Sequence, residues 1–481
     1  MTGRQRLLFS LIAAACLLVA AARFIVPRWS GDGGVDADAG AGAGNGANAD
    51  AGGVSDGRGG DVGDATEWSQ GELAQAAQVI RVGADEWADL VTTSMPPGHD
   101  WVLLPAEPDV AGEDFHAAVR GEQRGFLTAD ACRECHADYC DSFAASGHAR
   151  SSALPDPQTV LGSFAEGAAE LSTASGNLSF RMIQEGLQLQ QRLQLRDPVA
   201  KQVYEQLFEF GVVLGSGRHG QSYLWWQRDR LYQMHVSYLS ETGTWVNSPG
   251  PYADGTADFS RPVPPRCLDC HATWAAWDSE AVNRFDRESL VLGISCVRCH
   301  GPAHEHIAFH RAQPDASTAF RIVNPSSLSV ERQNEICAQC HSGGELLGRP
   351  FAYRPGTPLE EWLAADLDAG DQENADPHSA NQLARLLQSK CYTQSGGMTC
   401  VSCHDPHSAD VELVTTTVLQ CRGCHDPNPC LQPQRTGLTG NQDCVNCHMP
   451  PRRDAQVQIE TTAGNIQALL RDHLIGVQGQ Q

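Results

Sequence analysis

The pattern Cys-x-x-Cys-His occurs seven times in this chain of 481 residues. Two thiols at this spacing can bond to the two vinyl groups of one porphyrin, and the adjacent imidazole can bind the iron as its proximal ligand. Zinc ribbons and thioredoxin-like redox pairs also use Cys-x-x-Cys, but neither needs a His after every second Cys. The pattern therefore predicts seven covalently attached haem c groups, each with its iron. The predicted residues are Cys132, Cys135, His136; Cys267, Cys270, His271; Cys296, Cys299, His300; Cys337, Cys340, His341; Cys400, Cys403, His404; Cys421, Cys424, His425; and Cys444, Cys447, His448.

The spacing of the motifs predicts that the haem groups lie close together. The first motif stands 130 residues before the second, and the later gaps are 24, 36, 58, 16 and 18 residues. Such short gaps leave little chain to separate one macrocycle from the next. From 265 to 453 the chain reads as short helices and loops with few aliphatic side chains, so macrocycles would have to supply much of the interior.

The long first gap contains strand-like sequence. Five segments there alternate or cluster β-forming residues between Gly-rich turns, at 178–183, 187–195, 209–214, 222–227 and 231–238. We expect a small antiparallel β insert at about 175–250, between the first and second motifs. The predicted fold class is mainly α, with short helices and loops packed around stacked haems and this insert added to them.

The N-terminus resembles an export signal. Arg4 and Arg6 precede an apolar run from Leu7 to Val26 that is broken only by Arg23. Residues 1–28 are therefore either a cleaved signal peptide or a membrane anchor, and we favour the anchor. Residues 29–66 are rich in Gly, Ala and Asp and have too few apolar side chains to fold, which predicts a disordered linker.

Two further segments complete the predicted domain organisation. Residues 67–127 form an N-terminal segment of unknown role, with helix-like stretches at 72–81 and 85–91. Residues 128–475 form the seven-haem cytochrome c domain. We expect the protein to be periplasmic or otherwise extracytoplasmic, tethered to the inner membrane.

The charge of the chain limits its partners. The formal net charge is -24, which excludes binding to a phosphate backbone as a main role. The expected partners are redox proteins, cationic or membrane-bound, together with the membrane itself through the N-terminal anchor. The sequence does not predict an oligomeric state.

The sixth ligand of each iron decides its role, because a second imidazole closes the iron to substrate whereas an empty position leaves it reactive. Several short segments resemble the multihaem cytochrome c superfamily, which includes pentahaem nitrite reductase, octahaem hydroxylamine oxidoreductase and the tetrahaem cytochrome that serves the latter. They are Ser146-Gly147-His148-Ala149, Cys299-His300-Gly301-Pro302-Ala303-His304, Cys403-His404-Asp405-Pro406-His407, and Cys447-His448-Met449-Pro450 with His473. The resemblance covers about residues 128–475. It implies distal ligands at His148, His304 and His407, and further candidates at His378 and His473.

Five distal candidates leave two irons without an assigned partner. His219, His235, His306 and His310 remain as alternatives, each of which could bind an iron, bond to a propionate or face solvent. No Cys-x-x-Cys-Lys occurs, and seven motifs are present where hydroxylamine oxidoreductase would have eight. We therefore expect an electron carrier more than an enzyme, one that conducts electrons along closely packed haems between redox partners.

The alternative is a multihaem oxidoreductase that acts on small nitrogen or sulfur oxyanions at one five-coordinate haem. Arg218 and His219, in a Gly-rich segment, could bind such an anion, or could simply belong to a turn. Four Cys lie outside the motifs. A disulfide between Cys391 and Cys430 is possible, with Cys140 as the alternative partner, and Cys16 lies in the apolar N-terminal run.

Overall fold

The structure is a computed structural model of the whole chain. It describes residues 77–92, 100–106, 128–173, 176–197, 201–249, 256–367, 382–408, 420–425, 444–461 and 464–476. The predicted anchor at 1–28, the predicted linker at 29–66, Cys16, His378 and Cys430 lie outside these residues. Within the described ranges, none of the helices combines the length and the apolar character needed to cross a bilayer.

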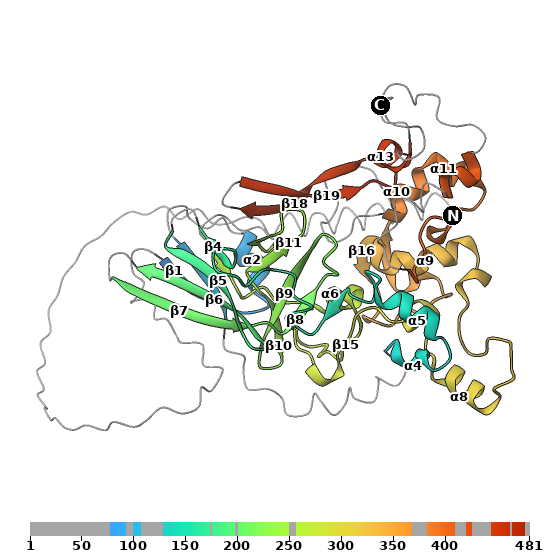
Figure 1. Cartoon of the computed structure of the whole chain (residues 1–481), viewed down its shortest axis with the longest axis horizontal. Helices are drawn as coiled ribbons and strands as arrows, with labels where there is room; N and C mark the ends of the chain where they lie inside the picture. Colours follow the sequence, from blue (N-terminus) through green and yellow to red (C-terminus); the bar gives the residue numbers. More distant parts are fainter. Residues whose placement is uncertain are drawn as a thin grey trace, which may run out of the picture. The chain divides into compact units, whose positions relative to one another are not determined.

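The expectation of a mainly α fold is wrong. The described residues form six β-sheets, most of them antiparallel, and their longest helix has only 12 residues. Antiparallel strands do lie between the first and second motifs, but they are no small addition (Figure 1). They recruit strands from outside the interval 175–250, and further strands follow the later motifs.

The first antiparallel sheet has four strands in the order β4-β5-β6-β7. Its strands are β4 (Glu170–Ser172), β5 (Leu178–Glu185), β6 (Gln188–Asp197) and β7 (Gln202–Glu209). Leu178, Phe180 and Met182 alternate with more exposed residues along β5 and are all buried. This period of two places one face of the sheet against the core.

The second antiparallel sheet has six strands in the order β12-β11-β9-β8-β3, with β10 paired to β9. Its strands are β3 (Ser152–Ala153), β8 (Val212–Leu214), β9 (Gly220–Gln227), β10 (Arg230–Gln233), β11 (Val236–Leu239) and β12 (Thr244–Asn247). The fully buried Gln191 of β6 joins the two antiparallel sheets. Its side-chain nitrogen donates to the Val236 carbonyl at 2.6 Å, and its oxygen accepts from the Val236 N–H at 3.2 Å.

The core between these sheets is aromatic. The rings of Phe208 and Phe259 stack with centroids 3.7 Å apart, and Trp225 packs edge-on against Phe208 at 4.9 Å. His235 is also part of this core, 4.7 Å from the ring of Phe180. Its Nδ1 accepts a hydrogen bond from the Asp258 N–H at 3.1 Å. The strand-rich region therefore has a protein core of its own.

Part of the N-terminal segment belongs to this β region. A three-stranded parallel sheet has the order β1-β2-β13, with β1 (Ala77–Val82), β2 (Asp100–Pro105) and β13 (Thr256–Asp258), and helix α2 (Trp87–Thr92) lies between β1 and β2 in the chain. The helix-like interpretation of 72–81 is therefore wrong over residues 77–81, which belong to β1. Val102 and Leu104 of β2 join the aromatic core, which gives this segment a packing role.

Short helices carry most of the Cys-x-x-Cys-His motifs. Motif residues lie in α4 (Asp130–Arg133), α6 (Pro265–His271), α7 (Val297–His300), α9 (Val330–His341) and α13 (Cys444–His448), and the helices α5 (Ala137–Ala144), α8 (His304–Ala312), α10 (Gln382–Gln388) and α11 (Lys390–Ser395) lie between them in the chain. Pro265 starts α6 at a position where its missing N–H costs nothing, and the Ser329 side chain caps α9 by accepting from the Arg332 N–H.

Single-turn helices and small sheets connect these elements. The 3-10 helices are η2 (Arg287–Ser289), η3 (Pro325–Ser327), η4 (Leu359–Glu361) and η6 (Cys400–Ser402). The two-stranded sheets pair β14 (Ala272–Trp274) with β15 (Val291–Leu292), β16 (Gly343–Leu346) with β17 (Leu363–Asp366), and β18 (Pro451–Thr461) with β19 (Gly464–Arg471).

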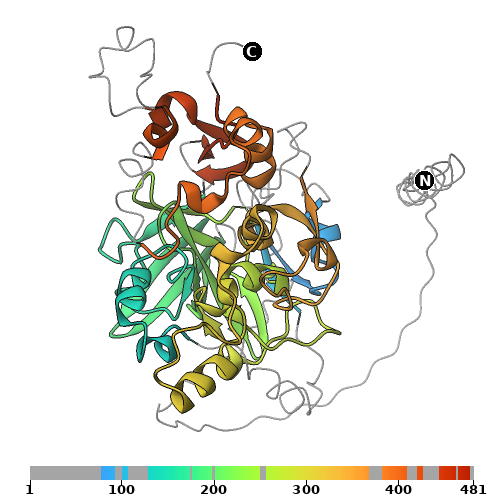
Figure 2. The same cartoon turned by 90° about the vertical axis from the view of Figure 1, so that its right-hand side faces the viewer.

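Two contacts join the β region to the motif helices. A second hydrophobic cluster combines Leu224 and Leu231 of the sheet with Leu268 of α6 and Phe351. The β18–β19 hairpin, red in Figures 1 and 2, packs on β12 and contributes Ile466 to a small cluster with Leu239 and Val246. The β region thereby fixes both the second motif and the C-terminal hairpin.

Candidate functional site

One large cavity is lined by residues of all seven motifs. Its volume is about 5050 Å³, and it reaches from Cys132 of the first motif to His448 of the last. Pockets for a single small ligand usually measure about 300 to 1,000 Å³. This cavity therefore has room for several large cofactors and is much too big for one small substrate.

The secondary structure aims the motif histidines at this cavity. In α6, α7, α9 and α13 the motif His is the last residue of the helix. Hydrogen bonds to backbone carbonyl oxygens then fix the rings. The Nδ1 of His271 lies 3.2 Å from the Ser151 oxygen, the Nδ1 of His300 lies 2.9 Å from the Val323 oxygen, and the Nδ1 of His448 lies 2.9 Å from the Gly476 oxygen. Because a carbonyl oxygen only accepts, Nδ1 carries the proton and Nε2 remains available to bind a metal.

Four motif histidines face a second imidazole across the cavity. The ring centroids are 6.4 Å apart for His136 and His306, 6.1 Å for His300 and His407, 6.1 Å for His341 and His148, and 6.0 Å for His404 and His473. A bond of about 2 Å from each ring nitrogen to one shared ion would place the ring centres about 6 Å apart. All four spacings therefore fit an iron held between two imidazoles.

Local structure explains how the non-motif rings of these pairs reach the cavity. The buried Ser146 accepts a hydrogen bond from the Ala149 N–H at 3.1 Å and so shapes the turn that carries His148. The Asp405 carboxylate accepts from the His407 N–H at 2.9 Å in a similar turn.

The position of His473, the partner of His404, is fixed by the adjacent residue Asp472. Asp472, next to His473, forms an ion pair with Arg385 of α10 at 2.5 Å. Burial would raise the pKa of Asp472, but its hydrogen bonds with Arg385 and with the Leu474 N–H keep that pKa below its usual value. The carboxylate therefore stays charged and ties His473 to α10.

Burial keeps two of these imidazoles neutral, which is the form that binds a metal. Desolvation lowers the pKa of His341 to about 4, with His148 as the next contributor, and burial lowers the pKa of His473 to about 4 as well. Neither ring would need to lose a proton at neutral pH before binding an iron.

The other histidines singled out in the sequence are placed differently. His304 has a side chain that is 58% exposed and does not line the cavity, whereas His306, two positions later, does. The Nδ1 of His306 lies 3.0 Å from the Phe320 carbonyl oxygen, as in the motif histidines. His310 and His219 also line the cavity, and His235 lies in the β core.

His306, one of four alternative ligands in the sequence, lies opposite His136 in the structure. Its i, i+4 relation to His310 was the available signal, and their rings are 4.6 Å apart. Within the described ranges, His271, His425 and His448 form no facing pair of the kind seen at the other four motifs. Cys140 is buried, with its sulfur 3.5 Å from the Ala129 carbonyl oxygen.

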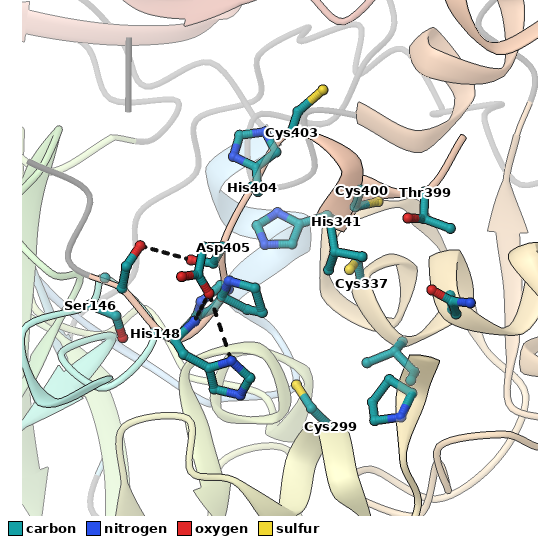
Figure 3. A pocket seen from close by; sticks show the side chains of 18 of the residues that line it. Ser146, His148, Cys299, Cys337, His341, Thr399, Cys400, Cys403, His404 and Asp405 are labelled. Atoms are coloured by element: carbon teal, nitrogen blue, oxygen red, sulfur yellow. Dashed lines mark hydrogen bonds and ion pairs between the residues drawn. The ribbon is translucent and has the colours of Figure 1, made fainter. Parts of the chain in front are cut away.

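The motif thiols bring different motifs into contact. Thiols lie within hydrogen-bonding reach of each other in the pairs Cys132 and Cys296, Cys270 and Cys340, and Cys337 and Cys400. These contacts link motif one with three, two with four, and four with five. Figure 3 shows the last contact, with Cys337 beside Cys400 and the rings of His341 and His404 in the same hollow.

The residues present fit haem c. Each motif supplies two thiols and an imidazole, four of these imidazoles face another at the spacing of one iron, and the cavity is large enough for several macrocycles. The residues that would hold the irons at these four motifs are the two imidazoles of each pair. The thiols would provide the covalent bonds.

Comparisons with known proteins agree with this fit. A family model described as Cytochrome c554 and c-prime matches residues 219–301, which include the second and third motifs. A curated protein, Multiheme cytochrome MtrA of Shewanella baltica (strain OS185), is 25% identical over 146 residues. The match covers 29% of this chain and 38% of that relative, so the chain spans well under half of the relative's length.

No solved structure matches the chain. The residue spacing, the arrangement of the motifs around one cavity and the two similarities point to the same class of protein. Together they support a multihaem c-type cytochrome, a class of protein that binds iron haem covalently and transfers electrons.

Proposed function

We propose that this protein is an extracytoplasmic electron carrier with seven haem c groups. When bound, haem c supplies an iron that takes up and releases one electron. The observation that carries the proposal is the single cavity lined by all seven motifs. One shared cavity brings the cofactor sites together, as conduction between them requires.

The chain's own residues favour a carrier over a catalyst. At four motifs a second imidazole faces the motif His, which would close both axial positions of the iron. A closed iron can exchange electrons but has no position for substrate. We propose His306, His407, His148 and His473 as the distal ligands of motifs one, three, four and five.

The contacts between motifs suggest a continuous route. Thiols are in contact between motif one and motif three, between motif two and motif four, and between motif four and motif five. Motif three touches motif four through a hydrogen bond from the Gln339 side chain to the Arg298 carbonyl at 3.1 Å. Cys403, Cys421 and Cys444, of motifs five, six and seven, line the same cavity.

The haem count can be tested by mass. Intact-mass spectrometry of the denatured protein should show seven thioether-linked haems, and a Cys400→Ala, Cys403→Ala double variant should show six. A pyridine haemochrome assay gives the same count independently. Absence of covalent haem would contradict the proposal, and a smaller whole number in the unmodified chain would show that the number seven is wrong.

The carrier role can be tested by spectroscopy. Low-temperature electron paramagnetic resonance of the oxidised protein should show low-spin ferric iron at the four paired motifs at least. Reductive titration should show all bound haems exchanging electrons with one another. High-spin iron at most sites, or haems that do not equilibrate, would contradict conduction through the cavity.

The place of action and the partner are further parts of the proposal. The apolar run after Arg4 and Arg6 supports export, and the net charge of -24 supports a cationic redox partner. A fusion of residues 1–66 to a reporter that is active only outside the cytoplasm should be active. Electron transfer to a small cationic cytochrome should slow as ionic strength rises, and a rate independent of salt would contradict steering by charge.

A further inference from the structure

The second spacer residue of three motifs forms a buried polar junction. In Cys-x-x-Cys-His the two spacers are not fixed by haem attachment, so their identity is free to serve another purpose. Motifs two, three and four place Asp269, Arg298 and Gln339 at the second spacer, and all three side chains are buried. The first spacers of the same motifs are the buried apolar residues Leu268, Val297 and Ala338.

These three spacers are bonded to one another across the motifs. Arg298 donates through one guanidinium nitrogen to the Asp269 carboxylate at 2.9 Å and to the Asp269 carbonyl at 2.8 Å. Gln339 donates to the Arg298 carbonyl at 3.1 Å. Arg266 completes the junction, because it donates to the other Asp269 oxygen at 2.9 Å and to the Gln339 carbonyl at 3.0 Å.

The junction carries a net positive charge in a buried place. Two guanidinium groups face one carboxylate, and the side chains of Arg298 and Asp269 are 4% and 7% exposed. Burial alone would lower the pKa of Arg298, but the charge of Asp269 raises it above its usual value, so the guanidinium stays protonated. Among the described residues, Arg298 Nε and Gln339 Oε1 are buried without a hydrogen-bond partner.

Stability alone is a poor explanation for this arrangement. A buried ion pair contributes little net stability compared with well-packed apolar residues, and each buried polar atom without a partner is costly. A charge inside a low-dielectric interior, in contrast, acts strongly on nearby redox groups. Arg298 is bonded directly to Cys299 in the chain, as Asp269 is to Cys270 and Gln339 is to Cys340.

We propose that the junction of Asp269, Arg298, Arg266 and Gln339 raises the reduction potentials of the haems held by motifs two, three and four relative to those held elsewhere in the chain. Reduction adds one negative charge, and a buried positive charge stabilises that state. The contacts between motifs also meet at these three motifs. Motif one contacts motif three, and motif three contacts motif four. Motif four also contacts motifs two and five. Electrons would therefore collect at this crossing. The inference rests on the proposed electron-carrier function.

Redox titration of matched variants tests the proposal. Arg298→Gln should lower the potentials of a subset of the haems, Arg298→Lys should shift them less, and Asp269→Asn should raise them. The opposite signs are diagnostic, because a purely structural role would give both variants the same kind of defect. Low-spin spectra and full haem loading, measured by mass, should be unchanged in each.

Arg311→Gln is the matched control. Arg311 pairs with Glu134, the second spacer of the first motif, but their side chains are 63% and 61% exposed. Solvent screens an exposed pair, so the control should leave the potentials of the haems at motifs two, three and four unchanged.

A second variant protects the test against misfolding. Arg266 shares the same carboxylate, and its side chain is 29% exposed, so Arg266→Gln should be tolerated and should lower the same potentials by a smaller amount. Fully loaded Arg298→Gln or Arg266→Gln protein with unchanged potentials would overturn the inference and leave the carrier function intact. Shifts of the same sign in Arg298→Gln and Asp269→Asn would also overturn it. Absence of haem from the unmodified protein would instead defeat the proposed function itself.

Discussion

His304 and His306 lie two positions apart at the start of α8, and they differ in what they face. His306 faces His136 with ring centroids 6.4 Å apart, whereas the His304 side chain is largely exposed and lies within 4.0 Å of Glu305. Residues two positions apart in an α-helix are rotated by about 200° from each other, so only one of the two can point into a given cavity. The rotation of a helix about its axis thus decides which histidine can reach the iron.

This difference predicts the outcome of a pair of substitutions. His306→Ala should open the iron at the first motif and produce a high-spin ferric signal from one haem, which also binds carbon monoxide after reduction. His304→Ala should leave the low-spin spectrum unchanged and serves as the control. A high-spin signal from the His304 variant alone would contradict the proposed ligand.

A second prediction at this scale concerns acid stability. Burial lowers the pKa of His235 to about 3, so the unfolded chain takes up a proton there between about pH 6.5 and pH 3 that the folded chain does not. Above pH 6.5 the ring is neutral in both the folded and the unfolded chain, so His235 does not change the free energy of unfolding. As the pH falls through this window, the folded protein loses stability. The loss should reach about 2 to 3 kcal/mol at pH 4.5.

The pH effect can be isolated with His235→Asn, which keeps an acceptor for the Asp258 N–H. Thermal unfolding of this variant should depend less steeply on pH between 6.5 and 4.5 than that of the unmodified protein. Parallel pH profiles for the two proteins would contradict a buried, neutral His235.

At the scale of elements, the segment that carries His148 is held by the turn after β15. The Ile294 N–H donates to the His148 carbonyl at 2.9 Å, and the Gly293 N–H donates to the Ser152 side chain at 2.9 Å. Gly293 has φ of 70°, and a Cβ on it would lie 2.3 Å from the Ala149 carbonyl oxygen. Only glycine allows this close approach of the two backbones.

Gly293→Ala should therefore displace His148 from His341. We expect a partial high-spin signal and a loss of stability larger than the 1 to 3 kcal/mol, roughly, that an unfavourable φ costs by itself. Gly186→Ala is the control, because Gly186 has φ of 63° but nothing within 4 Å of the added Cβ. Equal stability losses in the two variants, with unchanged spectra, would contradict the role of this contact.

Elements were predictable where the pattern was local. The alternation of β5 predicts a strand because Leu178, Phe180 and Met182 are all buried on one face. Strands β1, β2 and β13 are paired although β13 lies more than 150 residues after β2, and no local pattern encodes that pairing. The same limit applies to the distal ligands, because helix rotation and packing, rather than spacing, place His306 opposite His136.

At the scale of the whole molecule, the two regions differ in what fills them. The β region has an aromatic core made of protein side chains, whereas the motif helices surround a cavity of about 5050 Å³. Without macrocycles the apolar side chains around this cavity would face water, so the motif region should depend on haem to fold. The β region should fold without haem.

Hydrogen exchange on chain produced without haem tests this difference. Amides of β5, β6 and β9 should remain protected, while those of α6, α7 and α9 should exchange at nearly unfolded rates. The haem-loaded protein is the control and should protect both regions. Equal protection of both regions in the haem-free chain would contradict the dependence on cofactor.

The thiol contacts between motifs restrict how the protein can be made. Cys132 and Cys296 are 164 positions apart in sequence, yet their sulfurs meet in the folded chain, as do those of Cys337 and Cys400. If the chain compacted first in an oxidising compartment, these pairs would be ready to form wrong crosslinks that block cofactor attachment. We therefore expect haem attachment to take place on the extended polypeptide, so that every motif is loaded before its distant neighbour comes close.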